Sequence, residues 1–157
     1  MIKYKPDTVS IVFAEVPDEI TLAIEITNCQ GQCEGCHSPW LREDIGEELT
    51  VEILHKLIDE NRGITCVCFM GEGKDPEVLK KLALSVKYRS DYPYKTALYS
   101  GRCEVEGDYD NYFDYLKIGP FLPSKGPLNV ETTNQRLYKV VDGKREDITF
   151  KFWRKPF

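Results

Sequence analysis

The sequence lacks several features that mark common classes of protein. No apolar run approaches the roughly 20 residues that cross a bilayer, and residues 1–7 lack the apolar core of a signal peptide. Basic residues are not in excess either. The net charge is −5 at pH 7, whereas non-specific nucleic-acid binding needs a basic surface. We therefore expect a cytoplasmic protein that binds neither nucleic acid nor membrane.

Disulfide bonds are also not favoured, although the chain has six cysteines. An even count suggests disulfides mainly in small secreted proteins, and cytoplasmic thiols stay reduced. Three of the six lie within eight residues, namely Cys29, Cys33 and Cys36. This clustering points to a metal site.

Length and composition fit a single domain over residues 1–157. Of the 157 residues 41% are hydrophobic and 30% are charged, which is typical of a globular protein with one core. Residues 20–26 place isoleucine or leucine at every second position, as on one face of a strand. Residues 64–70 form a continuous apolar run, typical of a strand buried on both faces. Residues 95–99 and 115–118 predict two more strands.

Two helices are predicted between these strands. Thr50 is a suitable N-cap for a helix through about Asn61, which Gly63 ends. Asp75 is a suitable cap for a second helix, with Pro76 at its first position. Their apolar stripes consist of Ile53, Leu54, Leu57 and Ile58 and of Leu79, Leu82, Ala83 and Val86.

The order of elements predicts the fold class. Strand–helix–strand units imply a parallel sheet, and a full barrel needs about 250 residues. Residues 136–141 and 148–153 alternate around Asp142-Gly143, which predicts a hairpin. We expect an α/β fold, a partial (open) β/α barrel with parallel strands and a short C-terminal hairpin. Chemistry in such folds gathers at the C-terminal ends of the strands.

The cysteine segment follows the first predicted strand directly, with the spacing C-x3-C-x2-C. Thiolates bind both iron–sulfur clusters and zinc. Three thiolates around a four-iron cluster leave one iron without a protein ligand, and an open position is what a reactive centre needs. The alternative is a zinc site with His37 or a distant cysteine as fourth ligand. Zinc sites commonly pair two short knuckles, and a second C-x2-C is absent from the sequence.

This spacing after the first strand of a β/α chain resembles the radical-SAM superfamily. The resemblance implies a [4Fe-4S] cluster on Cys29, Cys33 and Cys36, whose open iron is chelated by S-adenosylmethionine. One electron from the cluster then cleaves the cofactor to a 5′-deoxyadenosyl radical. The superfamily also has a Gly-Gly-Glu-type stretch after the second strand that binds the methionine amino group. Residues 70–73, Met-Gly-Glu-Gly, stand at that point; the alternative for them is a plain turn.

A closer resemblance covers most of the chain. Residues 36–40, Cys-His-Ser-Pro-Trp, are similar to the glycyl-radical activases. Residues 117–121, Lys-Ile-Gly-Pro-Phe, and 132–138, Thr-Thr-Asn-Gln-Arg-Leu-Tyr, resemble the activating proteins of anaerobic (class III) ribonucleotide reductases. The partial barrel would then be of radical-SAM type. Asn28 stands where glycine often precedes the first cysteine, and asparagine also tolerates positive φ.

The resemblance supplies the remaining site candidates. It implies that the segment around Gly35, Cys36 and His37 contacts the cofactor, as do Gly71, Glu72 and Gly73. Ser100 closes the third strand, as a loop start or as a polar contact to the cofactor. Arg136 is the expected anchor in a segment too polar to be core, because its planar fork binds carboxylate or carbonyl groups.

Other reactive side chains are expected to be structural. Cys66 and Cys68 lie two apart on one strand and read as small buried hydrophobes, while Cys103 follows a strand end. His55 lies on the exposed side of its helix. The acidic residues between 108 and 114 read as a solvated face or partner surface rather than a carboxylate site.

The sequence as a whole predicts an activase of anaerobic ribonucleotide reductase. Its substrate would be a glycine Cα–H on the large reductase subunit, and reduced flavodoxin or a similar protein would donate the electron. Two alternatives stay open: another radical-SAM enzyme acting on a small molecule, and a non-enzymatic zinc or iron–sulfur module.

Overall fold

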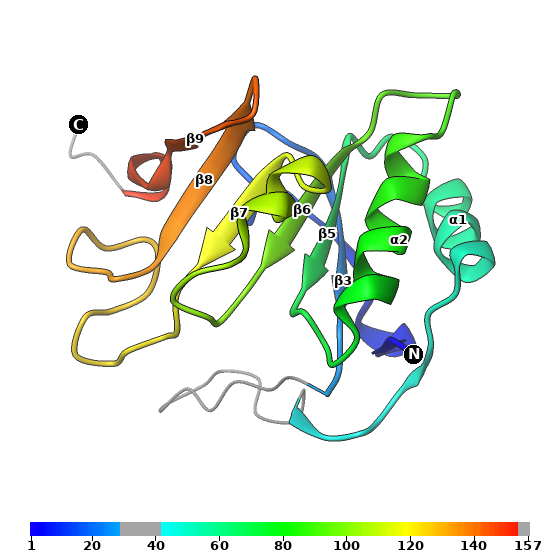
Figure 1. Cartoon of the computed structure of the whole chain (residues 1–157), viewed down its shortest axis with the longest axis horizontal. Coiled ribbons are helices and arrows are strands. Elements are labelled where there is room, and N and C mark those ends of the chain that lie inside the picture. Colours follow the sequence, from blue (N-terminus) through cyan, green and yellow to red (C-terminus); the bar gives the residue numbers. More distant parts are fainter. Residues whose placement is uncertain (29–41, 154–157) are drawn as a thin grey trace.

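The computed structural model describes residues 1–28 and 42–153. In this part of the chain, two α-helices cover one face of a seven-stranded mixed sheet of order β2-β3-β5-β6-β7-β8-β9 (Figure 1). The central strands run parallel: β3 (Thr21–Glu25), β5 (Cys66–Met70), β6 (Lys95–Tyr99) and β7 (Tyr115–Ile118). The predicted α/β fold with parallel central strands is therefore confirmed.

The outer strands of this sheet run antiparallel to their neighbours. β2 (Ser10–Val12) pairs with β3 and was not predicted, because three residues are too few for a pattern. β8 (Arg136–Val141) pairs with β7, and β9 (Lys144–Asp147) pairs with β8. The hairpin turn has φ of 51° at Asp142 and 74° at Gly143. Two positive φ angles are what a two-residue hairpin turn of type I′ requires.

The second strand of the hairpin was wrongly placed at residues 148–153. There the chain leaves the sheet and forms the 3-10 helix η4 (Thr149–Phe152). The Asp147 carboxylate accepts hydrogen bonds from the Thr149 backbone N–H at 3.0 Å and from its hydroxyl at 2.6 Å. Such a local side-chain bond competes with the strand ladder. The apolar residues after it pack against the sheet instead of extending it.

Both predicted helices are confirmed, with their caps. α1 (Val51–Glu60) starts after Thr50, whose hydroxyl accepts a hydrogen bond from the Ile53 N–H at 3.2 Å. α2 (Pro76–Lys87) starts after Asp75, whose carboxylate accepts one from the Val78 N–H at 3.3 Å. All four residues of the α2 apolar stripe are buried. In the described residues, no helix combines the length and apolar character that a bilayer crossing needs.

Three smaller elements complete the described chain. A two-stranded antiparallel sheet pairs β1 (Lys3–Tyr4) with β4 (Glu47–Glu48). The 3-10 helix η1 (Pro6–Thr8) connects β1 to β2. A second one, η3 (Gly107–Asn111), precedes β7. The β1–β4 sheet brings the N-terminus and residues 47–48 beside the end of β3, where Tyr4 bridges to Ile26.

The core is divided by the sheet. On the helix face, α1 and α2 pack on large strand residues that are fully buried: Leu22, Ile24, Val67, Phe69, Leu98 and Leu116. The opposite face carries a separate cluster of mostly smaller residues: Cys66, Cys68, Ala97, Tyr115 and Leu137, covered by Val16 and Ile148. Ile20, expected in the stripe of β3, is 40% exposed because it precedes the strand.

Candidate functional site

The base of the cysteine segment lies at the C-terminal edge of the parallel strands. Asn28, which follows β3, has φ of 61°, so the expectation that it adopts positive φ is confirmed. Its backbone N–H donates to the Glu43 carbonyl at 3.2 Å. The two ends of the segment therefore meet. The predicted ligands Cys29, Cys33 and Cys36, together with Gly35 and His37, lie outside the described residues.

A side-chain clamp holds the two ends of this segment together. The Asp44 carboxylate accepts hydrogen bonds from Lys3 Nζ at 2.8 Å and from Asn28 Nδ2 at 3.2 Å. The Thr27 hydroxyl donates to the Ile45 carbonyl at 2.7 Å. The bonds to Lys3 and Asn28 lower the pKa of Asp44. The clamp is thus formed by chain on both sides of the cysteines.

The turn Gly71-Glu72-Gly73 lies against the end of β3. Its glycines have φ of 118° and 67°, a backbone conformation that glycine adopts at no steric cost. A Cβ on Gly71 would stand 3.2 Å from the Ile26 carbonyl oxygen, and one on Gly73 would stand 2.9 Å from Ile2 Cδ1. The turn therefore packs tightly against Ile26 and Thr27, as expected for segments that share one edge of the sheet.

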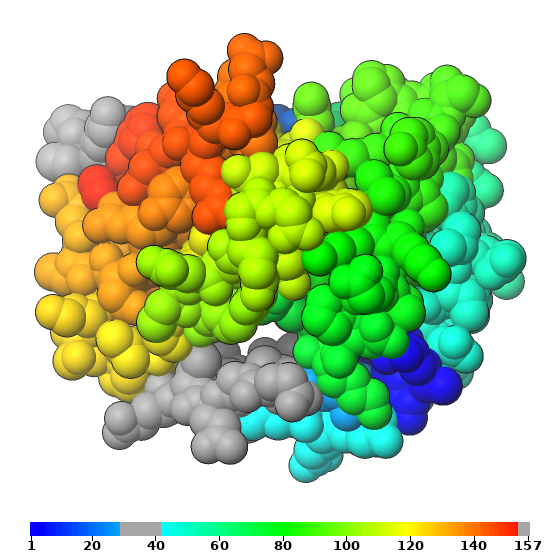
Figure 2. Space-filling view, in the orientation of Figure 1, coloured from blue at the N-terminus to red at the C-terminus, as the bar shows by residue number. Residues whose placement is uncertain are grey.

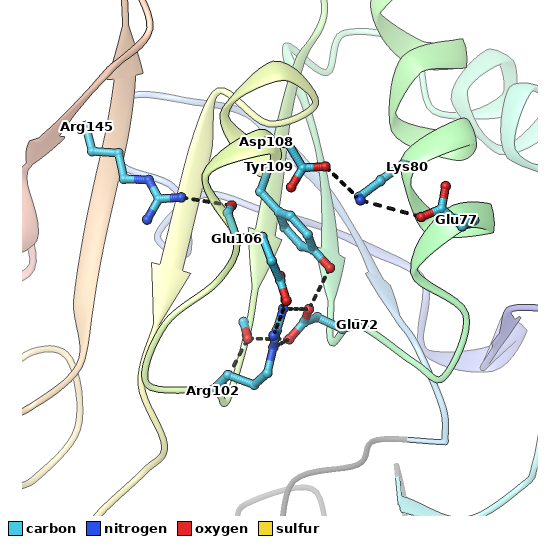
Figure 3. A network of polar contacts seen from close by, with 9 residues as sticks. Glu72, Glu77, Lys80, Arg102, Glu106, Asp108, Tyr109 and Arg145 are labelled. Atoms are coloured by element: carbon cyan, nitrogen blue, oxygen red, sulfur yellow. Dashed lines mark hydrogen bonds and ion pairs between the residues drawn. The ribbon is translucent and has the colours of Figure 1, made fainter.

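Two residues that the sequence put forward separately, Glu72 and Ser100, are in direct contact. Ser100 is 1% exposed and its hydroxyl donates to Glu72 Oε2 at 2.5 Å. The Glu72 carboxylate also accepts from Arg102 and from the Tyr109 hydroxyl, the latter at 3.2 Å (Figure 3). The structure thus gives Ser100 a partner inside the protein. A contact between Ser100 and a cofactor stays a prediction.

A pocket of about 520 Å³ opens beside this network on the helix face. Its walls come from the 71–74 turn, the first residues of α2, and the segment 101–109 that includes η3. In the space-filling view α2 and this segment lie side by side (Figure 2). Arg102 lowers the pKa of Glu106 to about 2 through hydrogen bonds. Burial and the nearby Glu72 charge raise the pKa of Tyr109 to about 12.

A second cavity, of about 330 Å³, lies on the opposite face of the sheet. Tyr99 and Lys117 line it from the paired ends of β6 and β7, with Gln135 and Phe152 beside them. Lys117 is only 9% exposed, and its ammonium donates to the Gly119 carbonyl at 3.1 Å. The sequence-based prediction includes Lys117 only as part of the 117–121 segment and gives it no site role of its own. A lysine within a short apolar strand is the sequence feature that could have identified it, since buried lysine is rare without a partner.

The two segments that carry the reductase-activase resemblance contact each other. Gln135 Nε2 donates to the Gly119 carbonyl at 3.3 Å, and Asn134 Nδ2 donates to the Pro120 carbonyl at 3.0 Å. The expectation that residues 132–136 are too polar for the core is wrong for two of them. Thr133 and Gln135 are buried, because hydrogen bonds satisfy their polar groups.

The side chain of Arg136, the expected anchor, lies at the surface beside Asp147. Its guanidinium lies 3.7 Å from the Asp147 carboxylate, and its side chain is 37% exposed. Exposed ion pairs of this kind contribute little to stability, about 0–1 kcal/mol. Its role toward a partner stays a prediction.

The scattered cysteines behave as predicted. Cys66 and Cys68 are fully buried on the second face, and burial raises the pKa of both thiols strongly. Neutral buried thiols are poor metal ligands. The third scattered cysteine, Cys103, is exposed. Within the described residues, no group of three or more histidine, cysteine and acidic side chains is placed to hold a metal ion.

The expectation that His55 is solvated is wrong. Its Nδ1 lies 3.1 Å from the Arg89 guanidinium, and burial together with the Arg89 charge lowers the pKa of the imidazole. The side chain is half-buried because Arg89 folds over this part of α1, where it also binds Asp59.

The acidic residues of segment 108–114 do not form a carboxylate site. Each pairs with its own cation: Asp108 with Lys80 at 2.8 Å, Asp110 with Arg145 at 2.7 Å and Asp114 with Lys87 at 3.0 Å. These pairs join the segment to α2 and to β9. They are thus part of the tertiary contacts rather than a freely solvated face.

Comparison with known proteins adds no relative. No family model, curated protein or solved structure matches the chain. A functional assignment therefore depends on the cysteine motif and on the geometry of the sheet edge from which it starts.

Proposed function

We propose that the protein is a radical-SAM enzyme that forms a glycyl radical on the large subunit of an anaerobic ribonucleotide reductase. One observation carries the proposal. The C-x3-C-x2-C segment starts at the C-terminal edge of a parallel sheet, and its two ends are held together by the Asn28–Glu43 hydrogen bond. That edge is where α/β folds bind ligands.

The donor set suits the proposed cluster. Cys29, Cys33 and Cys36 would hold a [4Fe-4S] cluster, because three closely spaced thiolates match its ligand preference and leave one iron open. When bound, the cluster supplies the electron that splits S-adenosylmethionine. Cys66 and Cys68 offer no competing site, since both thiols are buried and burial raises their pKa values.

The chain's own residues would bind the cofactor at the same edge. The turn Gly71-Glu72-Gly73 offers close backbone approach beside Ile26 and Thr27, the residues that lead into the cysteine segment. On the other face Lys117 places a buried positive charge beside a cavity, which suits the carboxylate of an amino-acid group. The protein's task would be to orient the cofactor and keep water from it.

The sheet also supports a partial barrel of radical-SAM type. Both α-helices cover one face of the sheet (Figure 1). The opposite face retains a cavity of about 330 Å³ at the strand ends. A macromolecular substrate could complete such an open site. Reduced flavodoxin or a similar donor is proposed as the electron source.

The test begins with anaerobic reconstitution of the full chain with iron and sulfide. We expect four irons and four sulfides per chain and, after reduction, conversion of S-adenosylmethionine to 5′-deoxyadenosine and methionine. Cys33→Ala should lose the cluster, and Cys66→Ala should keep it. One bound zinc with no cluster would instead support a zinc module.

Identification of the substrate needs a separate experiment. The reconstituted protein, the reductase, S-adenosylmethionine and reductant should give the doublet of a glycyl radical in electron paramagnetic resonance. Arg136→Ala should lower the radical yield with the cluster intact. A doublet on another glycyl-radical enzyme, with none on the reductase, would retain the chemistry and overturn the assigned substrate. Cofactor cleavage coupled to a small molecule would favour the other radical-SAM alternative.

A further inference from the structure

The Arg102 guanidinium binds the Glu72 carboxylate through two parallel hydrogen bonds. Its Nε donates to Glu72 Oε2 at 2.9 Å and its Nη2 donates to Oε1 at 2.8 Å (Figure 3). This paired geometry fixes direction as well as distance, and it is stronger than a single charged contact. The same guanidinium binds Glu106 at 3.0 and 2.8 Å. Two carboxylates therefore hold one arginine.

The Glu72 carboxylate has little capacity left for a ligand. Besides Arg102 it accepts from the Ser100 hydroxyl and the Tyr109 hydroxyl, and a carboxylate has about four acceptor positions. Its side chain is 18% exposed. What the 71–73 turn still presents is backbone, and the positive φ angles of Gly71 and Gly73 shape that backbone.

Arg102 also ties together the ends of three parallel strands. Glu72 follows β5, and Ser100 follows β6 and accepts from the Arg102 N–H at 3.1 Å. The Arg102 carbonyl accepts from the Gly119 N–H, after β7, at 2.7 Å. The guanidinium lies 5.7 Å from the centre of the Tyr109 ring. A single residue thus connects the ends of three of the four parallel strands, β5, β6 and β7, at the edge where the cofactor is proposed to bind.

We infer that Arg102 is a positioning residue for S-adenosylmethionine: it draws the Glu72 side chain back against the end of β6, so that the 71–73 turn meets the cofactor with its backbone. This inference rests on the proposed function. On this inference the Glu72 carboxylate does not contact the cofactor directly. It acts indirectly, by holding the shape of the 71–73 turn.

The chain provides a matched control in Arg89. Its guanidinium also binds two carboxylates, Asp59 and Asp91, at 2.7 Å each. It lies between α1 and the segment that leads into β6, at the opposite edge of the sheet. Arg89→Gln therefore removes the same kind of ion pair without touching the 71–73 turn.

The test measures S-adenosylmethionine affinity of the reconstituted protein by equilibrium dialysis. Arg102→Gln should weaken binding about 10-fold or more, as loss of a supporting contact does, with cluster content unchanged. Arg102→Lys should lose less, and Arg89→Gln should bind like the wild type. Arg102→Gln combined with Glu72→Gln should bind no worse than the weaker single variant, because the two residues act as one unit.

The outcomes separate the inference from the proposed function. If the wild-type protein binds S-adenosylmethionine and Arg102→Gln binds it equally well, the inference is wrong and the proposed function stands. Additive losses in the double variant would also overturn it. If the reconstituted wild type binds none, the proposed function fails and the inference fails with it. Thermal unfolding of each variant shows whether the fold is intact. If Arg102→Gln does not fold, the S-adenosylmethionine affinity of Arg102→Lys tests the inference instead.

Discussion

The two faces of the central sheet are covered in different ways. On the helix face, α1 and α2 bury large aliphatic and aromatic residues completely. On the other face, the strands present small residues such as Cys68 and Ala97, and the cover comes from irregular segments around Val16 and Ile148. Beneath the two helices this face is closely packed, and its pocket of about 520 Å³ opens only beside the 71–74 turn and the start of α2. The other face retains a cavity of about 330 Å³ against the ends of β6 and β7.

This difference assigns different tasks to the two faces. Close packing of large side chains is the main source of stability in a small domain. A cavity gives up such contacts, and it persists where polar groups such as Lys117 and Gln135 line it. We interpret the closely packed part of the helix face as the main source of stability, and the strand ends together with the second face as the region open to ligands. The following predictions test that contrast, from the largest expected effect to the smallest.

The largest effect is expected from truncation on the helix face. Phe69 is fully buried, and its ring meets that of Phe113 edge-on at 6.2 Å. Phe69→Ala should lower the free energy of unfolding by about 3–5 kcal/mol, because it removes buried surface and leaves a cavity. Urea denaturation measures this change. Phe150, which is 49% exposed, is the control, and Phe150→Ala should change stability by less than about 0.5 kcal/mol.

The second face should respond to alkaline pH. Burial raises the pKa of Cys66 and Cys68 in the folded state, whereas unfolded thiols have a pKa of about 8.5. The unfolded state therefore loses protons first, so this part of the stability is present below pH 8.5 and declines as the pH rises above it. The loss should approach about 1.4 kcal/mol per pH unit for each thiol. The variant with both cysteines changed to alanine should have a flatter profile up to pH 10; an unchanged slope would contradict the assignment.

A smaller loss of stability is expected where the irregular segment 13–19 packs on the strands of the second face. The Tyr99 hydroxyl donates to the Glu15 carbonyl, which anchors residues 13–19 over the second face. Tyr99→Phe should cost about 1–2 kcal/mol, because the part-buried Glu15 carbonyl loses its donor. Chemical denaturation gives the value. Tyr92→Phe is the control at an exposed ring, and equal losses in both variants would mean that the anchor is unimportant.

The smallest effect concerns the cover of the helix face. Thr50 caps α1 through the bond from the Ile53 N–H. Thr50→Ala should lower stability by about 1 kcal/mol, and Thr50→Ser should retain most of the cap. Thermal or urea unfolding distinguishes the two. A cofactor affinity changed by Thr50→Ala would show that the two faces are not independent.

The helices and the parallel strands were predictable because their signals are local. Thr50 and Asp75 each satisfy free N–H groups of the helix that follows them, and this chemistry is visible in the sequence. The apolar run that became β5 was equally clear. Strand β2 and the 3-10 helix after β9 were missed, since the first is too short for a pattern and the second depends on the Asp147 side chain.

The candidate site was predictable as a set of segments and not as a set of contacts. The sequence by itself determined that the cysteine motif, the Gly71-Glu72-Gly73 turn and Ser100 all follow strands, because hydrophobic periodicity locates strand ends. Only the tertiary structure decided that Glu72 is held by Ser100, Arg102 and Tyr109. It also decided that Lys117 is buried and that Arg136 is not. These contacts join residues distant in sequence, and no local pattern specifies which strand ends become neighbours.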